Sequence, residues 1–353
     1  MSRSRLQPWR SRATALALAL SALCARGAEA DPLSRQRLDG LNVIVTPGHP
    51  FGDATAKDSL ANAKALGTKA IAVVPFLWQA SPARPDLQRG NDMGDQELRN
   101  AIRDAHALNL AVMVKPQIWV PDRWAGAVEM QSESAWQKWF ADYRREVLRI
   151  AQIADEEKAD AVAIGTELEL TSQRPEWTGL IAAARAAYSG RLLYVAHNVE
   201  EAVQVPFWDA LDAIGVTLYP PLGADDDRQG RRAVMRANAD RLEILAALTG
   251  KPVVVAEIGL RSAAGAAARP WESVEERAAA PDPALQAAVI GDWLAALDRP
   301  AIDGVMIWRW FTDPEAGGMR DTDFTVQGKP AERVLACAWA HRCQHEQAAV
   351  PAP

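Results

Sequence analysis

The sequence predicts an α/β protein that folds as a single (β/α)₈ TIM barrel, and three observations lead to this fold class. Short runs of β-branched and other apolar residues alternate with longer segments of helical spacing. The runs number eight, as in a barrel of this kind. Each run is continuously apolar, which is typical of parallel strands buried on both faces. An open doubly wound sheet is the alternative, but "TPGHPFGD" after the first run lacks the GxGxxG spacing of a phosphate-binding loop.

The expected strands follow the apolar runs. Several of the segments between them end in Gly or Asn, which tolerate the left-handed turn after a helix. The connection after the fifth strand, "NVEEAVQVPFWDALD", shows the weakest helical pattern. The strands are expected at residues 41–45, 69–76, 110–116, 160–166, 191–196, 213–219, 251–257 and 304–310.

Both ends of the chain are expected to lie outside the barrel. Residues 1–30 have the layout of a secretory signal peptide: a start rich in Arg, an apolar stretch too short to span a bilayer, and a small-x-small "AEA". We therefore expect export, to the periplasm or out of the cell. The barrel is assigned to residues 31–343, and residues 344–353 are expected to form a disordered C-terminal tail.

Charge and composition exclude several function classes. Residues 1–30 hold five Arg and one Glu, so the remainder has 34 basic and 44 acidic side chains and a formal net charge of −10. An acidic chain does not predict nucleic-acid binding, which needs a basic face. No further apolar run is long enough for a membrane span. No Cys/His cluster has metal-ligand spacing, so no metal or other cofactor is expected. Oligomeric state has no signature in the sequence.

Two cysteines remain after the signal segment, Cys337 and Cys343, six residues apart. In an oxidising compartment they could close a small disulfide. Two free or partly buried thiols are the alternative, and the spacing does not choose between them.

Carboxylates stand at the ends of two expected strands. The stretch "AIGTELEL" (163–170) places Glu167 and Glu169 after the fourth strand, and "VVVAEIGL" (253–260) places Glu257 at the end of the seventh. Catalytic groups of such barrels lie at the C-terminal strand ends, so Glu167 and Glu257 can face each other across the mouth. Two carboxylates about 5 Å apart suit retaining glycoside cleavage, and their repulsion keeps one protonated. Period-two alternation puts Glu169 on the same side as Glu167, one step further out.

Tryptophans gather at the same strand ends. Flat apolar rings with an N–H donor suit the apolar faces and hydroxyl edges of sugars. A soluble exported protein is not expected to expose several of them without a use. Those at or just past expected strand ends are Trp78, Trp119, Trp124, Trp308 and Trp310.

Several segments resemble those of glycoside hydrolase family 113. They are "IGTELE", "VVVAEIGLRS", "GVMIWRWFTDPEAGG" followed by "DTDFTVQGKPAERVL", and "GDQELRNAIRDAHALNLAVMVKP", and the similarity runs over most of residues 40–336. Members of this family are retaining (β/α)₈ enzymes with the acid/base on strand four and the nucleophile on strand seven. Its characterised members are β-mannanases.

By position, the resemblance implies roles for five residues. Glu167 matches the acid/base and Glu257 the nucleophile. Trp308 matches the tryptophan that floors the subsite where the bond breaks, and Tyr219 matches a tyrosine that donates a hydrogen bond to the nucleophile. Lys115 is expected to be a positively charged, hydrogen-bonding substrate contact, with a salt bridge to a rim acid as the alternative.

Further substrate contacts are expected around this centre. Gln117 stands where the resemblance implies His, and Asn198 aligns loosely with a residue at the fifth strand. Trp78 and Trp119 are expected to form sugar subsites. Trp271 lies in the long loop 261–282, which we expect to fold over the barrel mouth; a mobile or partly helical surface flap is the alternative.

The sequence thus predicts a retaining β-glycoside hydrolase acting on an extracytoplasmic polysaccharide or oligosaccharide, and the resemblance implies β-mannan. A catalytically inactive carbohydrate-binding or assembly protein is the alternative, although simple binding does not require both glutamates. A barrel enzyme of another class is disfavoured, because HxH spacing and a Gly-rich phosphate loop near strands seven and eight are missing. Sugar identity, linkage and endo or exo action have no signature here.

Overall fold

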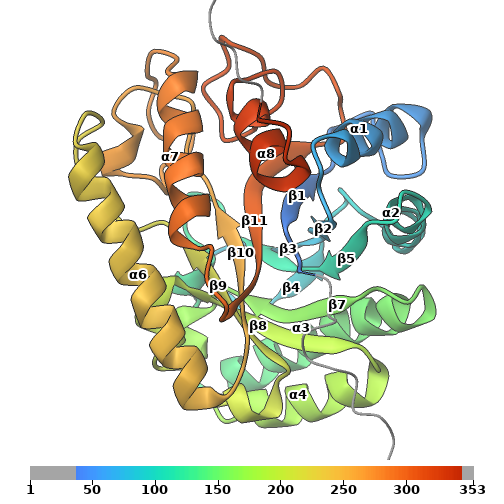
Figure 1. Ribbon diagram of the computed structural model, residues 1–353. Coiled ribbons are helices and arrows are strands. Elements are labelled where there is room, and N and C mark those ends of the chain that lie inside the picture. The colour runs from blue at the N-terminus through green and yellow to red at the C-terminus, as the bar shows by residue number, and fades with distance from the viewer. Residues whose placement is uncertain (1–36, 344–353) are drawn as a thin grey trace, which may run out of the picture. The chain divides into compact units, whose positions relative to one another are not determined.

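The computed structural model describes residues 37–343 (Figure 1). The signal peptide expected at residues 1–30 and the tail expected at 344–353 lie outside the described residues. No helix within residues 37–343 is long and apolar enough to cross a membrane.

Eight strands form a closed barrel in the order β1-β11-β10-β9-β8-β7-β5-β2, and all neighbouring pairs are parallel. The predicted (β/α)₈ barrel is confirmed, and the open sheet is excluded because β1 pairs with both β2 and β11. Each of the eight predicted runs overlaps one barrel strand. The strands are β1 (Gly40–Ile44), β2 (Ala70–Val73), β5 (Ala111–Val114), β7 (Ala161–Thr166), β8 (Arg191–His197), β9 (Ala213–Leu218), β10 (Val253–Ile258) and β11 (Ile302–Phe311).

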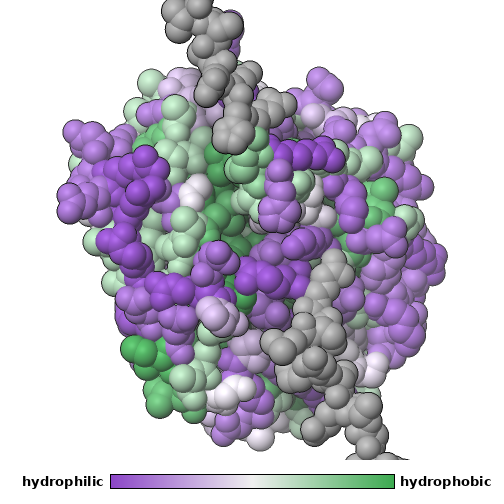
Figure 2. Space-filling view, viewed as in Figure 1, coloured by the Kyte–Doolittle hydropathy of each residue, from purple (hydrophilic) through white to green (hydrophobic). Residues whose placement is uncertain are grey.

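Helices surround these strands (Figure 1). On the face shown in Figure 2, hydrophilic residues cover most of the outer surface, as expected for helices whose apolar stripe faces the barrel. The five-residue α5 accounts for the weak helical pattern after the fifth strand. The helices are α1 (Ala54–Ala65), α2 (Asp95–Ala107), α3 (Glu133–Glu156), α4 (Glu176–Ala187), α5 (Asn198–Ala202), α6 (Arg228–Thr249), α7 (Pro283–Ala296) and α8 (Ala331–Ala340).

An aromatic cluster supports β7 from outside the barrel. Trp139 and Tyr143, one turn apart on α3, stack with ring centroids 4.9 Å apart, and the Tyr143 hydroxyl donates to the carbonyl of Ile164. A Cβ on Gly165 would lie 2.8 Å from the ring of Trp177 and 2.9 Å from that of Tyr194. The glycine near the end of β7 is therefore required by close packing of aromatic rings against this strand.

A second, three-stranded sheet follows the barrel strands β2 and β5. Its middle strand β3 (Phe76–Gln79) pairs in parallel with β6 (Gln117–Trp119) and antiparallel with β4 (Leu87–Arg89). Since β3 and β6 each begin three residues after a barrel strand ends, this sheet extends from the C-terminal end of the barrel. The sequence analysis did not predict it.

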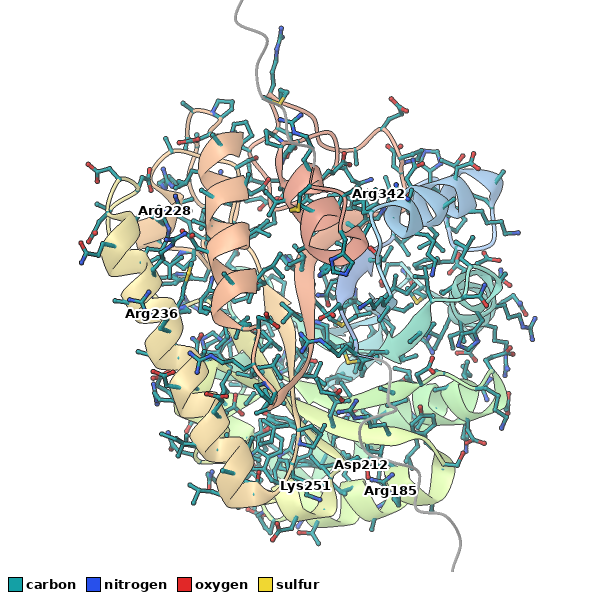
Figure 3. The ribbon with its side chains drawn as sticks, in the orientation of Figure 1. Arg185, Asp212, Arg228, Arg236, Lys251 and Arg342 are labelled. Carbon is teal, nitrogen blue, oxygen red and sulfur yellow. A yellow bond between two sulfur atoms is a disulfide. The ribbon has the colours of Figure 1, made fainter. Side chains whose placement is uncertain are left out.

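Polar contacts tie the opposite end of the barrel together (Figure 3). Arg185 donates to the Asp212 carboxylate at 2.6 Å, and the same carboxylate accepts from the backbone N–H of Leu192 at 2.8 Å. Lys251 Nζ donates to the carbonyl of Leu211 at 2.7 Å. These groups precede β8, β9 and β10, so they stabilise the N-terminal strand ends, away from the end where barrel active sites lie.

The segment "DTDFTVQGKP" (321–330) clamps the loop after β10. Lys329 is buried, and its Nζ donates to Ser262 Oγ at 2.8 Å, to Asp321 Oδ1 at 2.6 Å and to the carbonyl of Asp323 at 3.0 Å. A buried ammonium with three oxygen partners fixes both chain segments it joins.

Arg261 anchors the loop 261–282 from within. Its buried guanidinium donates to the carbonyls of Ser273 and Arg277, both at 2.9 Å, and to that of Thr322 at 3.0 Å. Helical structure in this loop is confined to one short 3₁₀ turn, Ala266–Ala268. These hydrogen bonds hold the loop in place, so it is a pinned loop and not a free surface flap.

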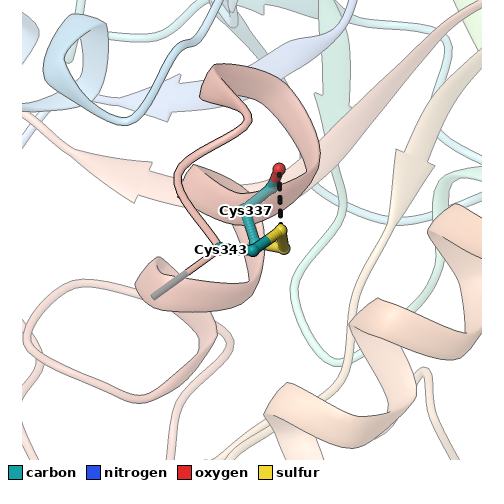
Figure 4. The surroundings of a disulfide bond; sticks show 2 residues. All are labelled: Cys337 and Cys343. Carbon is teal, nitrogen blue, oxygen red and sulfur yellow. Dashed lines mark hydrogen bonds between the residues drawn. A yellow bond between two sulfur atoms is a disulfide. The ribbon is translucent and has the colours of Figure 1, made fainter. Parts of the chain in front are cut away.

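Cys337 and Cys343 form a disulfide, with Cα atoms 4.3 Å apart (Figure 4). The bond joins α8 to the residues that follow it. The alternative of two free thiols is excluded.

Candidate active site

Glu167 and Glu257 come together at the C-terminal end of the barrel, and both are buried, with 7% and 3% of their surface exposed. Thr217 on β9 connects them. It lies opposite Glu257 in the β9–β10 pairing, and its hydroxyl donates to Glu167 Oε1 at 2.6 Å. The negative charge of Glu167 also acts on the pKa of Glu257, so the two carboxyl groups share one electrostatic site.

Glu257 has a partner on each carboxylate oxygen. Lys115 Nζ forms an ion pair with Oε1, and both side chains are buried. The Tyr219 hydroxyl donates to Oε2 at 3.1 Å. Burial, together with the charges of Glu257 and Glu167, raises the pKa of Tyr219 well above its ordinary value, so the phenol stays protonated and able to donate.

The pKa of Glu257 lies above its ordinary value. Burial is the largest cause, Lys115 opposes it, and the charge of Glu167 adds to it. Lys115 is the strongest influence towards an ionised Glu257, and the hydrogen bond from Tyr219 acts in the same direction. Its ammonium also lies 3.4 Å from Gln117 Oε1 and 5.2 Å from the centroid of the Trp308 ring.

Glu167 follows β7 in a left-handed backbone conformation, with φ of 54°. Such an angle is uncommon outside glycine and is often associated with functional sites. Hydrogen bonds hold the turn: the Glu167 N–H donates to the carbonyl of Val195 at 2.7 Å, and the Leu168 N–H to the Tyr194 hydroxyl at 3.1 Å. Because the strand ends here, period-two alternation stops, and Glu169 lies in the following 3₁₀ turn. The expected placement of Glu169 along a continuing strand is wrong for this reason.

The Glu167 carboxylate is surrounded by donors. Besides Thr217, Oε1 lies 3.0 Å from His197 Nδ1, and Oε2 accepts from the Trp124 indole N–H at 3.1 Å. Burial raises the pKa of Glu167, but the hydrogen bond and charge of His197, with Thr217 and Lys115, hold it below its ordinary value. These partners therefore favour the ionised form of Glu167.

A further buried acid, Glu201, lies next to His197. The Glu201 carboxylate on α5 accepts from the Tyr194 hydroxyl and from the backbone N–H of His197, each at 2.5 Å. Burial raises the pKa of Glu201 to about 7. Because Tyr194 also contacts the backbone of Leu168, Glu201 braces both residues that shape the surroundings of Glu167.

Asn198 uses both ends of its side-chain amide within the protein. Its Oδ1 accepts from the backbone N–H of Tyr219 at 2.8 Å, and its Nδ2 lies 2.9 Å from His197 Nε2. The predicted substrate contact of Asn198 therefore competes with two internal contacts.

Trp78 and Trp119 lie side by side on the small sheet. They are paired in the β3–β6 register, with ring centroids 6.1 Å apart and exposures of 42% and 49%. Gln117 precedes Trp119 on the same strand and is partly exposed. Exposed indoles that extend from the mouth are available to stack on sugar rings.

The three remaining tryptophans differ in place. Trp308 lies beside Lys115, and Trp271 is 47% exposed on the pinned loop. Trp310 was expected at the rim, and this is wrong: it is buried, and its indole N–H donates to Ser59 Oγ on α1 at 2.8 Å. A register shift between β1 and β11 at Asn42/Val43 accounts for this, because an extra residue in one strand changes which face later side chains occupy.

Sequence reasoning missed His197 and Thr217 as site residues. Thr217 stands two residues before Tyr219 in the expected strand 213–219, so the inward alternation could have indicated it. His197 is the last residue of β8 and could have been taken with Asn198. Within residues 37–343, no group of three or more His, Cys, Asp or Glu is placed to hold a metal ion.

Comparisons with known proteins agree with this geometry. The model of glycoside hydrolase family 113 matches residues 44–329. A family 113 β-mannanase, AaManA from Alicyclobacillus acidocaldarius in complex with ManMIm, is 25% identical with a TM-score of 0.78, covering 88% of this chain and 99% of that one. A family 113 β-1,4-mannanase in a complex is 25% identical with a TM-score of 0.77, covering 87% and 100%.

More distant structures share the fold alone. The β-glucuronidase of Ruminococcus gnavus is 12% identical with a TM-score of 0.59, and the match covers 86% of this chain and 50% of that one. No match was found among curated proteins. Because the family model spans nearly the whole barrel, with both strand-end glutamates inside the match, the chain belongs to glycoside hydrolase family 113 and is a glycoside hydrolase.

Proposed function

We propose that this glycoside hydrolase cleaves β-mannan or its oligosaccharides with retention of anomeric configuration, with Glu257 as nucleophile and Glu167 as acid/base. The observation that carries the proposal is the unlike surroundings of the two carboxylates. Glu257 is paired with the Lys115 ammonium and Tyr219, whereas Glu167 is surrounded by neutral or titratable donors. Two carboxyl groups in unlike environments suit two different roles in one reaction.

The first step forms a glycosyl-enzyme. A Glu257 oxygen attacks the anomeric carbon while the bond to the leaving sugar breaks and Glu167 gives its proton to the leaving oxygen. In the second step the Glu167 carboxylate takes a proton from water. The resulting hydroxyl replaces Glu257 at the anomeric carbon, which returns both groups to their starting states.

Support for mannan comes from the structural neighbours. Both family 113 structures described above are β-mannanases, and the matches cover almost all of those chains. The exposed pair Trp78 and Trp119 beyond the mouth supports a substrate longer than a single sugar.

We also propose that the chain acts outside the cytoplasm. The pattern of residues 1–30 supports export, and the Cys337–Cys343 disulfide supports an oxidising compartment. Cell fractionation with N-terminal sequencing tests this: a mature chain that begins near Asp31 supports export, and an uncut cytoplasmic chain contradicts it.

The activity is tested by incubating the full mature chain with β-mannan, glucomannan, xylan and cellulose and measuring new reducing ends. Glu167→Gln and Glu257→Gln are the matched inactive controls, since each keeps the shape of the side chain. The proposal is supported if the natural protein produces new reducing ends from mannan-type substrates and neither variant does. Binding of mannan without new reducing ends would instead favour the non-catalytic carbohydrate-binding alternative.

A further inference from the structure

A chain of hydrogen-bond donors runs from the backbone after β9 to Glu167. The Tyr219 N–H can only donate, so the amide atom of Asn198 that lies 2.8 Å from it is the oxygen. The NH₂ end of that amide therefore lies 2.9 Å from His197 Nε2. An amide NH₂ also only donates, so Nε2 accepts, and the proton of a neutral ring is on Nδ1. From there it is donated to Glu167 Oε1 at 3.0 Å.

We propose that Asn198 is a positioning residue that keeps His197 in the neutral form protonated on Nδ1, so that Glu167, and not the histidine, carries the acid proton. This inference rests on the proposed role of Glu167 as acid/base. It concerns a residue that contacts Glu167 only through His197.

The surroundings of His197 explain why such a residue is needed. The charges of Glu167 and Glu169, in the segment after β7, and of Glu200 and Glu201, on α5, interact with the ring. Burial lowers the pKa of His197, whereas the hydrogen bond and charge of Glu167 and the charges of Glu169 and Glu201 raise it. Carboxylates alone would thus favour an imidazolium, which would hold the proton that the acid needs.

Asn198 opposes this protonation by geometry. A proton on Nε2 would point at the Asn198 NH₂ group. Turning the amide by half a rotation would instead set the NH₂ group against the Tyr219 N–H. Either arrangement leaves two donors facing each other in a part-buried site, which disfavours a proton on Nε2.

The same contacts select the oxygen of Glu167 that holds the acid proton. Oε1 receives both the Thr217 hydroxyl and His197 Nδ1–H, whereas Oε2 receives only the Trp124 indole N–H, at 3.1 Å. The acid proton therefore resides on Oε2. The Trp124 ring also packs on His197, with centroids 4.5 Å apart.

The Asn198→Asp variant tests the proposal with little change of shape. Asp keeps an oxygen for the Tyr219 N–H and tolerates the left-handed backbone at this position, where φ is 54°. It replaces the NH₂ donor by an oxygen that accepts from Nε2–H. His197 is then expected to become an imidazolium between two carboxylates.

The direct readout is the ¹⁵N–¹H spectrum of the histidine rings, in which the His197→Gln variant identifies the His197 signal. In the natural protein we expect a neutral ring protonated on Nδ1 between pH 6 and 8. In Asn198→Asp we expect both ring nitrogens to be protonated at pH 7. This measurement needs no substrate, so it separates a failure of this inference from a failure of the proposed function.

Kinetics give a second readout. For oligosaccharides, whose leaving sugar needs a proton, kcat/KM of Asn198→Asp is expected to fall by about tenfold or more. The reason is that the proton of the Glu167–His197 pair moves to His197, so Glu167 can no longer supply it. Dinitrophenyl glycosides, which need no proton, are expected to react nearly as before. The basic limb of the pH profile moves to higher pH, because a proton held between two carboxylates is lost later. A merely structural disturbance would lower kcat/KM for both kinds of substrate by the same factor. It would leave the basic limb of the pH profile where it is.

Asn109→Asp is the matched control, since Asn109 also has a left-handed backbone, with φ of 53°, but lies between α2 and β5. It should change neither the ring spectrum nor the pH profile. The proposal is overturned if His197 of the natural protein is doubly protonated at pH 6 to 7, or is protonated on Nε2. It is equally overturned if a folded Asn198→Asp keeps the natural tautomer and pH profile.

Discussion

The ion pair between Lys115 and Glu257 makes a prediction in which stability and activity change with pH together. Both side chains are buried, and burial already raises the pKa of Glu257. In Lys115→Met the carboxylate loses the positive charge that is paired with it. Breaking a buried pair costs about 3–5 kcal/mol if the remaining group stays ionised. Because that cost is avoided when the carboxyl group binds a proton, the pKa of Glu257 is expected to rise further.

The sign of the pH dependence follows from linkage. A carboxyl whose folded pKa exceeds its unfolded value binds its proton more tightly in the folded state, so stability falls as pH rises between the two values. Lys115→Met should therefore lose little stability at pH 4 to 5 and about 3 kcal/mol more at pH 8. The acidic limb of kcat/KM should move to higher pH, because Glu257 must be ionised to attack.

Urea unfolding at pH 5 and pH 8, with the pH profile of kcat/KM on a manno-oligosaccharide, measures both effects. Lys57→Met is the matched control: its ion pair with Asp104 is half exposed, so a loss below about 1 kcal/mol and an unchanged pH profile are expected. Adding Glu257→Gln to Lys115→Met should abolish the extra pH dependence. An equal loss of stability at the two pH values, with an unmoved acidic limb, would refute the reasoning.

The remaining predictions concern three other parts of the molecule. Glu167→Gln should still form the glycosyl-enzyme from dinitrophenyl glycosides, and azide should speed its breakdown, as followed by dinitrophenolate release; a variant near wild type on oligosaccharides would remove Glu167 from the acid role. Trp271→Ala should raise KM for polymeric substrate several-fold, whereas unchanged affinity and turnover would show that this exposed ring forms no subsite. A double Cys337→Ser, Cys343→Ser variant should lose about 2 kcal/mol of unfolding free energy and keep its kcat, and a loss of kcat at unchanged stability would contradict a purely structural disulfide.

The barrel could be predicted because its strands carry a strong local signal. A parallel strand buried on both faces is apolar at nearly every position, and each of the eight predicted runs overlaps a barrel strand. The small sheet had no comparable signal, since β4 and β6 are three residues long and are held by pairing with β3. Strands of three residues form because they pair with another segment of the chain, here β3, and not because of a local sequence pattern.

The candidate site was predictable at the strand ends and not beyond them. Glu167 and Glu257 follow from topology, because strand ends of a barrel meet at one mouth. Glu169 and Trp310 were misplaced, because a left-handed turn and a register shift each interrupt strand alternation. The contact of His197 with Glu167 depends on side-chain geometry between two strands, and no spacing in the sequence encodes it.

The central claim, that Glu257 is the nucleophile of a retaining mechanism, is tested most directly by trapping the intermediate. A fluorinated mannoside whose electronegative substituent slows the second step should leave a glycosyl ester on the enzyme, which peptide mass spectrometry can locate. We predict a single labelled peptide, with the sugar on Glu257, and no label in Glu257→Gln. A label on Glu167 or Glu169, or turnover of mannan with inverted products and no trapped ester, would contradict the account.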